Sequence, residues 1–139
     1  MRSKALWLAA LVSAVILLLG VRAFLDPVAA SASFGLPMHT DVETAFVRIY
    51  GARNVLLGAV ALVFAARGML RPLVLLFTLA TVLPLLDAAV IVSQIGLGHE
   101  LARHGVILLV LAAVSVSLWR QRQQDAPALG KAGVDQKLK

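Results

Sequence analysis

The segment FVRIYGARNVLLGA, residues 46–59, combines the apolarity of a membrane-spanning helix with three strongly polar side chains, Arg48, Arg53 and Asn54. The apolar run that it opens continues to Ala66. A charged side chain near the centre of a bilayer costs roughly 2.5–3.5 kcal/mol on insertion scales. The segment therefore predicts that other parts of the chain supply partners for these polar groups.

The composition as a whole is that of an integral membrane protein. The chain has 139 residues, 60% of them hydrophobic and only 14% charged, and its mean hydropathy is +0.91. A soluble domain typically has about 25% charged residues. The length fits one domain. The absence of cysteine excludes a disulfide framework, a thiolate metal site and a cysteine nucleophile.

The positive charge of the chain raises the question of nucleic-acid binding, since the net charge is +6 and the pI is near 10.9. Most of the Lys and Arg residues, however, flank apolar runs or lie in the C-terminal segment. That placement is typical of a membrane-topology signal. We therefore expect membrane lipids, and no nucleic acid, among the partners.

Four apolar segments are long enough to cross a membrane as helices, namely residues 5–24, 45–66, 72–92 and 101–119. Each has about 20 residues, which span a hydrocarbon core of roughly 30 Å at about 1.5 Å per residue. None shows the two-residue alternation of a barrel strand. The sequence therefore predicts an all-α fold, an integral membrane four-helix bundle in residues 1–120. A disordered basic tail, residues 121–139, is expected to follow it.

Local signals mark the ends of these segments. Thr40 and Glu43 have the spacing of a capping box immediately before the second segment. Pro72 suits the first turn of the third helix. Gly96 and Gly98 interrupt the chain before the fourth.

The distribution of charge predicts the orientation in the membrane. Lys and Arg flank the spans on one side, at Arg2, Lys4, Arg67, Arg71, Arg120 and Arg122. The loop of residues 26–44, on the other side, has no Lys or Arg. By the positive-inside rule both termini are cytoplasmic, in a multi-pass protein of the bacterial inner (cytoplasmic) membrane, with Trp7 and Trp119 at the cytoplasmic interface. A cleavable signal peptide ending near residues 21–23 is an alternative that the long apolar run disfavours.

In this topology the polar residues of the spans lie at one depth in the outer leaflet. Arg53 falls about 12 Å below the start of its helix, and Asp87 about 9 Å below the same membrane surface. An ion pair between Arg53 and Asp87 would offset much of the insertion cost of both. We therefore predict a polar pocket in which Arg53, Asn54, Asp87 and Tyr50 bind a ligand. Arg48 is shallow enough to reach the headgroups.

Two features of the spans bear on the shape of this pocket. Small side chains that permit close helix packing recur on one face of the second span, at Gly51, Asn54, Gly58, Ala61 and Ala65. This stripe also leaves homo-oligomerisation open. In the third span, Pro84 cannot donate to the carbonyl of Ala80, which predicts a kink beneath Asp87.

The apolar stretch PVAASASFGLP in the loop of residues 26–44 is either a cap over the polar layer or an interfacial loop without a special role.

No pattern for a metal or a cofactor is present. HELARH, residues 99–104, resembles the HExxH zinc motif, but one extra residue separates its histidines and turns them away from each other. Glu100 and His104 are four residues apart, so we expect a simple hydrogen bond between them at the interface. Nothing resembles a haem, flavin or nucleotide site, and we expect no cofactor.

Three stretches, LDPVAASASFGLP, RIYGARNVLLG and PLLDAAV, together resemble the family catalogued as domain of unknown function 4267 (DUF4267), small four-helix integral membrane proteins. The resemblance covers about residues 6–118 and implies the architecture but no established activity. Asn54 stands where an Asp is more often expected, which removes a possible second acid. The family is also distantly similar to DoxX-like proteins, some of which are quinone-linked.

Three functions fit these observations. In the first, the pocket binds a lipid-like, isoprenoid or quinone-type ligand, or the protein is an accessory subunit of a partner membrane protein. In the second, the protein is a small membrane-embedded isomerase or cyclase with Asp87 as its candidate catalytic acid or base. In the third, Arg53 and Asp87 only clamp the bundle. A transporter is disfavoured because the cytoplasmic half of the spans is aliphatic.

Overall fold

The computed structural model describes residues 3–137, which form six helices and no strand in that range. The helices are α1 (Lys4–Leu25), α2 (Pro27–Phe34), α3 (Asp41–Ala66), α4 (Leu70–Ala80), α5 (Val82–Ile95) and α6 (Glu100–Lys137). The predicted all-α fold is therefore confirmed. The helix α2 was not predicted, and it lies in the loop that separates the first two spans.

Four helices of the described chain are long and apolar enough to cross a membrane, which confirms the predicted multi-pass architecture. They are Lys4–Leu25, Asp41–Ala66, Leu70–Ile95 and Leu101–Asp125. Each contains or closely overlaps one of the predicted apolar segments. The third span consists of two helices, α4 and α5, in succession.

Local side-chain chemistry explains where α2 and α3 begin. Asp26 follows α1 directly, and its Oδ1 accepts a hydrogen bond from the Ala29 amide at 3.1 Å, so it caps α2. Thr40 Oγ1 accepts from the Glu43 amide at 3.3 Å, while Glu43 Oε2 accepts from the Thr40 amide at 3.1 Å. This is the predicted capping box, in which two of the amides left free at a helix start are satisfied reciprocally.

The third span breaks at Thr81, between α4 and α5. Pro84 lies three residues further on, and its ring excludes the hydrogen bond to the carbonyl of Ala80. The Thr81 amide bonds to the carbonyls of both Phe77 and Thr78, at 3.2 and 3.3 Å. The kink predicted from Pro84 is therefore present, and it redirects α5, the helix that carries Asp87.

Glycines let α1 and α3 pack backbone against backbone. A Cβ atom on Gly20 would lie 2.7 Å from the carbonyl oxygen of Gly51, and a Cβ on Gly51 would lie 2.7 Å from that of Gly20. A Cβ on Gly58 would lie 2.8 Å from the Leu17 amide. The predicted small-residue stripe thus faces α1 of the same chain. Homo-oligomerisation stays a prediction, and it would need a different surface.

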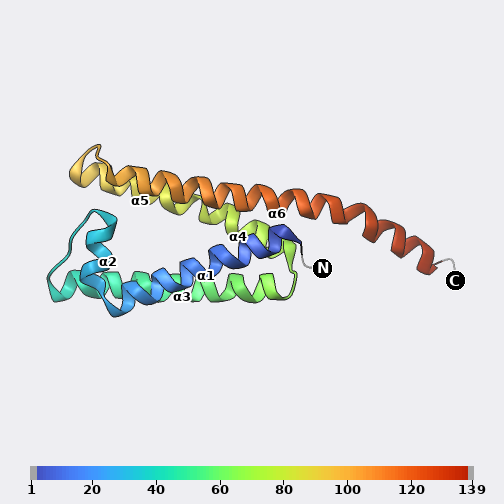
Figure 1. Cartoon of the computed structure of the whole chain (residues 1–139), viewed down its shortest axis with the longest axis horizontal. Helices are drawn as coiled ribbons and strands as arrows, with labels where there is room; N and C mark the ends of the chain where they lie inside the picture. The colour runs from blue at the N-terminus through green and yellow to red at the C-terminus, as the bar shows by residue number, and fades with distance from the viewer. Residues whose placement is uncertain (1–2, 138–139) are drawn as a thin grey trace.

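The helices form two pairs, α1 with α3 and α4–α5 with α6 (Figure 1). The pairs meet near the start of α1 and separate toward the end where α2 lies. The buried core occupies the first of these ends, where Ala9, Ala61, Leu73, Phe77 and Leu118 pack together. At the other end no such core joins the two pairs, and the described structure is hollow there.

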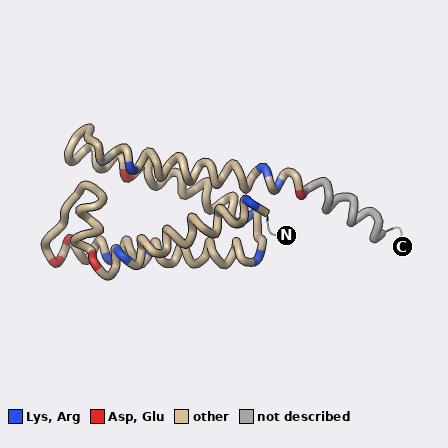
Figure 2. Tube along the Cα trace, in the orientation of Figure 1, with Lys and Arg blue, Asp and Glu red and all other residues tan. Residues whose placement is uncertain are grey.

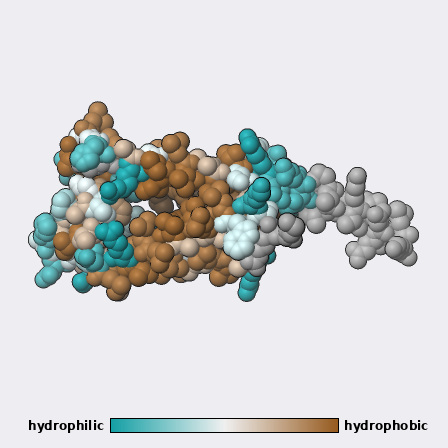
Figure 3. Space-filling view, in the orientation of Figure 1, coloured by the Kyte–Doolittle hydropathy of each residue, from teal (hydrophilic) through white to brown (hydrophobic). Residues whose placement is uncertain are grey.

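Charged residues gather toward the two ends of the described bundle and leave its middle free of them (Figure 2). We call the end with α2 the capped end. The opposite end, where α1 begins and where Lys4, Arg67, Arg71 and Arg120 lie, we call the basic end. Between them lies a hydrophobic belt with a visible hollow between the helix pairs (Figure 3). An exposed apolar belt of this kind matches a surface that faces lipid.

The helix α6 continues past the predicted end of the fourth span at Trp119 as far as Lys137. A disordered tail was predicted from Gln121, yet the backbone of this segment is helical in the structure. Gln121 Nε2 donates to Asp125 Oδ1 at 3.0 Å within it, a pairing typical of positions i and i+4. Local pairs of this kind support a helix that the apolar pattern does not indicate. Disorder of this segment in solution stays a prediction.

Candidate functional site

Two adjoining cavities lie between the helix pairs, one at the capped end and one that extends from it along the middle of the spans. The larger, which we call the membrane cavity, has a volume of roughly 370 Å³ and is walled mainly by aliphatic side chains of α1, α3, α4, α5 and α6. The smaller, which we call the cap cavity, has a volume of roughly 230 Å³ and lies beneath α2 and the loop that follows it. Four residues line both cavities and form their junction, Phe34, Tyr50, Asp87 and His104.

The segment that covers the cap cavity is fastened by hydrogen bonds and ring packing. Ser31 is buried, and its Oγ accepts from the Met38 amide at 3.1 Å while donating to the carbonyl of Val28 at 2.8 Å. The Phe34 ring meets the Tyr50 ring edge to face, with centroids 5.5 Å apart. Of the two roles considered for the loop of residues 26–44, the structure places it as a cap over Tyr50 and Asp87.

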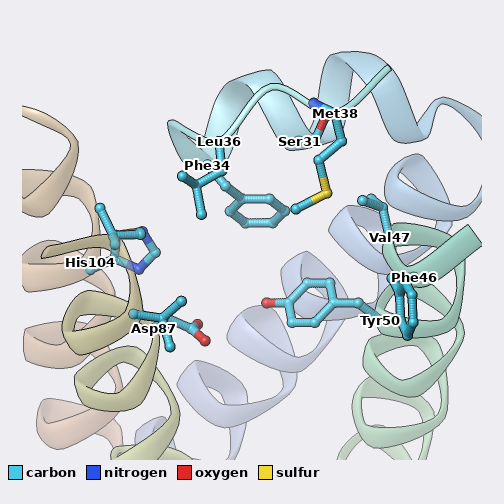
Figure 4. Close-up of a pocket in the computed structure, with 11 residues that line it drawn as sticks. Ser31, Phe34, Leu36, Met38, Phe46, Val47, Tyr50, Asp87 and His104 are labelled. Carbon is cyan, nitrogen blue, oxygen red and sulfur yellow. Dashed lines mark hydrogen bonds between the residues drawn. The ribbon is translucent and has the colours of Figure 1, made fainter. Parts of the chain in front are cut away.

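Polar groups from three helices converge at the junction (Figure 4). Tyr50, from α3, points its hydroxyl across the cavity toward Asp87, from α5. His104, from α6, lies beside Asp87 with its ring toward the cavity. Asp87 lies on α5, about 1.7 helical turns after the break at Thr81. The junction therefore holds a carboxyl, an imidazole and a phenol in otherwise apolar surroundings.

Of these residues, His104 gives the strongest indication of a binding site. Its side chain is only 4% exposed, and neither Nδ1 nor Nε2 has a hydrogen-bond partner among the described residues. The predicted partner, the Glu100 side chain, lies outside the described residues. A buried polar group left without a partner costs about 1–3 kcal/mol. As far as the described residues go, each imidazole nitrogen can therefore bond to a group that enters the cavity.

Sequence reasoning did not place His104 in the site, although a signal existed. His104, Ile107, Leu111, Val114 and Leu118 recur at steps of three and four along α6. All five are buried or half-buried, so His104 continues the inward-facing stripe of its helix. A histidine on the apolar face of a span is a functional candidate by its position alone.

Three of the four predicted site residues line a cavity and one does not. Tyr50 and Asp87 line both cavities, and Asn54 lines the membrane cavity. Arg53 is exposed and lines neither cavity. Among the described side chains no ion pair joins Arg53 to Asp87 within 4.0 Å.

Helix geometry explains why Arg53 turns away. Gly51 faces α1, and at about 100° per residue Arg53 lies about 160° around α3 from it. Asn54 lies about 60° from Gly51 and so stays on the inner side. The prediction relied on depth along the helix. Depth alone does not show which of Arg53 and Asn54 faces the cavity.

The described residues contain no group of three or more His, Cys, Asp or Glu side chains that could hold a metal ion. What the junction does offer is hydrogen bonding. Neutral imidazole presents one donor and one acceptor, a phenol presents both, and a carboxylate accepts only. Convergent polar groups at the edge of an apolar cavity are the usual form of a small-molecule site.

Comparison with known proteins places the chain in a family. The family described as domain of unknown function (DUF4267) matches residues 13–118, which include most of all four spans and all four junction residues. No curated protein and no solved structure shows a significant match. Because the match extends over most of its length, the chain belongs to the DUF4267 family.

Proposed function

We propose that this protein binds a lipid-like ligand of the isoprenoid or quinone type between its helix pairs. The polar part of the ligand lies at Tyr50, Asn54 and Asp87, and the apolar part occupies the membrane cavity. The observation that supports the proposal most strongly is the buried imidazole of His104, which lacks a hydrogen-bond partner in the described structure at the edge of an apolar cavity. The polar head group of a ligand would supply hydrogen-bond partners to this imidazole.

The size and walls of the membrane cavity agree with such a ligand. Small-molecule sites typically have volumes of about 300–1,000 Å³, and this cavity has roughly 370 Å³. A tail gains little by leaving the bilayer, because lipid tails are as apolar as leucine side chains. Selective binding therefore depends on the polar contacts at the junction rather than on the area of the apolar walls.

The proposed orientation puts the site in the outer leaflet of a bacterial inner membrane. It follows from the positive-inside rule, since the basic end is opposite the capped end (Figure 2). A role as an accessory subunit is compatible with the same site, because a bound lipid can also bridge to a partner membrane protein. The clamp interpretation has less support, since the described Arg53 and Asp87 side chains form no ion pair.

The test is native mass spectrometry of the protein extracted gently from its own membrane. We expect a discrete co-purifying mass in the wild type that is lost in Tyr50→Phe/Asp87→Asn double-variant protein. Arg53→Ala is the matched control, because Arg53 is exposed and outside both cavities. A folded wild type without any bound mass would contradict the proposal, and so would a mass that the double variant retains.

An enzymatic role for Asp87 is the second candidate, favoured by the neighbouring imidazole of His104 in the same apolar cavity (Figure 4). A carboxyl and an imidazole that face one substrate can act as general acid and base. Asp87→Asn preserves shape but cannot transfer the proton. If the ligand identified by mass spectrometry is converted by wild type and equally fast by this variant, Asp87 is not the acid or base.

A further inference from the structure

The described linings of the two cavities contain one acidic side chain and no Lys or Arg. Asp87 is the acidic member, and no described Lys or Arg lines either cavity. The basic residues adjacent in sequence, Arg53 next to Asn54 and Arg103 next to His104, are both exposed and outside the two linings. Phosphate and carboxylate groups are normally held by Arg, Lys or several amides. An anionic head would instead meet the carboxylate of Asp87.

The hydrogen-bonding groups suit a neutral head instead. His104 offers a donor and an acceptor, and neither nitrogen is used within the described structure. The Tyr50 hydroxyl points into the same space from the opposite wall (Figure 4). A hydroxyl or carbonyl group placed between them would accept from one and, in the case of a hydroxyl, donate to the other or to Asp87.

The dimensions of the membrane cavity limit the size of the apolar part of the ligand. Its volume of roughly 370 Å³ is near the lower end of the range for small-molecule sites, about 300–1,000 Å³. That space accommodates one chain rather than the two acyl chains of a phospholipid. Its walls come from the middle of the spans, from Leu11 and Leu76 to Leu111, so a chain entering from the junction runs toward the core at the basic end.

We infer that the ligand is an uncharged single-chain amphiphile with a hydroxyl or carbonyl head group, that His104 contacts this head group, and that the site discriminates against phosphate-headed lipids. This inference rests on the proposed function and specifies the class of ligand. Discrimination follows from the lack of a lining Lys or Arg and from the presence of Asp87, which in its ionised form repels an anion placed at the junction.

The inference is tested with two matched pairs of probes, farnesol against farnesyl phosphate and hexadecanol against hexadecyl phosphate. Each pair keeps the tail and changes only the head. Binding to the full chain in detergent micelles is measured by native mass spectrometry titration and by the shift in Tm. We expect at least one alcohol to bind saturably, with a Kd at least tenfold lower than that of its phosphate.

Variants separate a head-group contact from a structural effect. His104→Phe keeps an aromatic ring without hydrogen bonds and should weaken alcohol binding at least tenfold, whereas His104→Asn restores part of it. Asp87→Asn removes the repulsion, so the ratio of phosphate to alcohol affinity should rise. Arg53→Ala should leave the affinity for the uncharged alcohols unchanged, because Arg53 lines neither cavity. The Tm of each variant without ligand shows whether it is folded.

The possible outcomes test the head-group inference and the proposed function separately. If a phosphate binds as tightly as its alcohol, the head-group inference is overturned while the proposed function stands. If folded His104→Phe binds the alcohol like wild type, His104 is not the head-group contact. If no probe binds and wild type carries no lipid from its own membrane, the proposed function fails and the inference falls with it.

Discussion

Replacement of Gly51 by alanine tests the packing that holds the capped end in shape. The added Cβ would lie 2.7 Å from both the Gly20 carbonyl oxygen and the Phe24 amide nitrogen, and both of these are backbone atoms. Ordinary contact begins near 3.4 Å, so the two helices must separate locally by about 0.7 Å, the difference between 3.4 and 2.7. Overpacking of this kind costs roughly 1–3 kcal/mol.

The chain offers a matched control at Gly105, where an added Cβ meets nothing within 4 Å. Alanine is better than glycine in a helix by about 1 kcal/mol, and both sites are helical, so this gain cancels in the comparison. The difference in free energy of unfolding between Gly51→Ala and Gly105→Ala therefore isolates the packing term. We expect Gly51→Ala to be less stable by roughly 1–3 kcal/mol.

The assay is reversible unfolding of the purified variants in mixed micelles, with Tm as a second measure. Gly20→Ala should cost a similar amount, since a Cβ at either glycine would lie 2.7 Å from the carbonyl oxygen of the other. Because one separation of the helices relieves both clashes, the double variant should cost less than the sum of the two single variants. Equal stability of Gly51→Ala and Gly105→Ala would show that α1 and α3 are not in backbone contact.

Two further substitutions probe the break in the third span and the cap. Pro84→Ala restores the hydrogen bond to the Ala80 carbonyl, so EPR distances across the break at Thr81 should lengthen as the span straightens, and unchanged distances would mean that Pro84 does not cause the kink. Ser31→Ala removes the acceptor of the Met38 amide, which should cost about 1 kcal/mol and speed hydrogen exchange at that amide. Exchange at the wild-type rate would show that this bond does not hold the cap.

The confirmed predictions depend on properties that are local in the chain. The length and apolarity of a span, the Thr40–Glu43 capping box and the kink at Pro84 each involve residues no more than a few positions apart or a simple sum over a segment. Such properties follow from hydrophobicity and from backbone hydrogen bonding, whatever the neighbouring helices do. The short helix α2 was missed because its eight residues carry no apolar period, and its cap, Asp26, also ends α1.

The composition of the candidate site depended on how the helices face one another. The amino-acid sequence by itself predicted a common depth for Arg53, Asn54 and Asp87, because position along a helix follows from residue count. Only the tertiary structure decided that Arg53 faces outward and that His104 faces the cavity. The close contact of Gly20 with Gly51 sets the rotation of α3 about its axis. Packing against α4 and α5 sets the rotation of α6. Both are contacts between residues far apart in the chain.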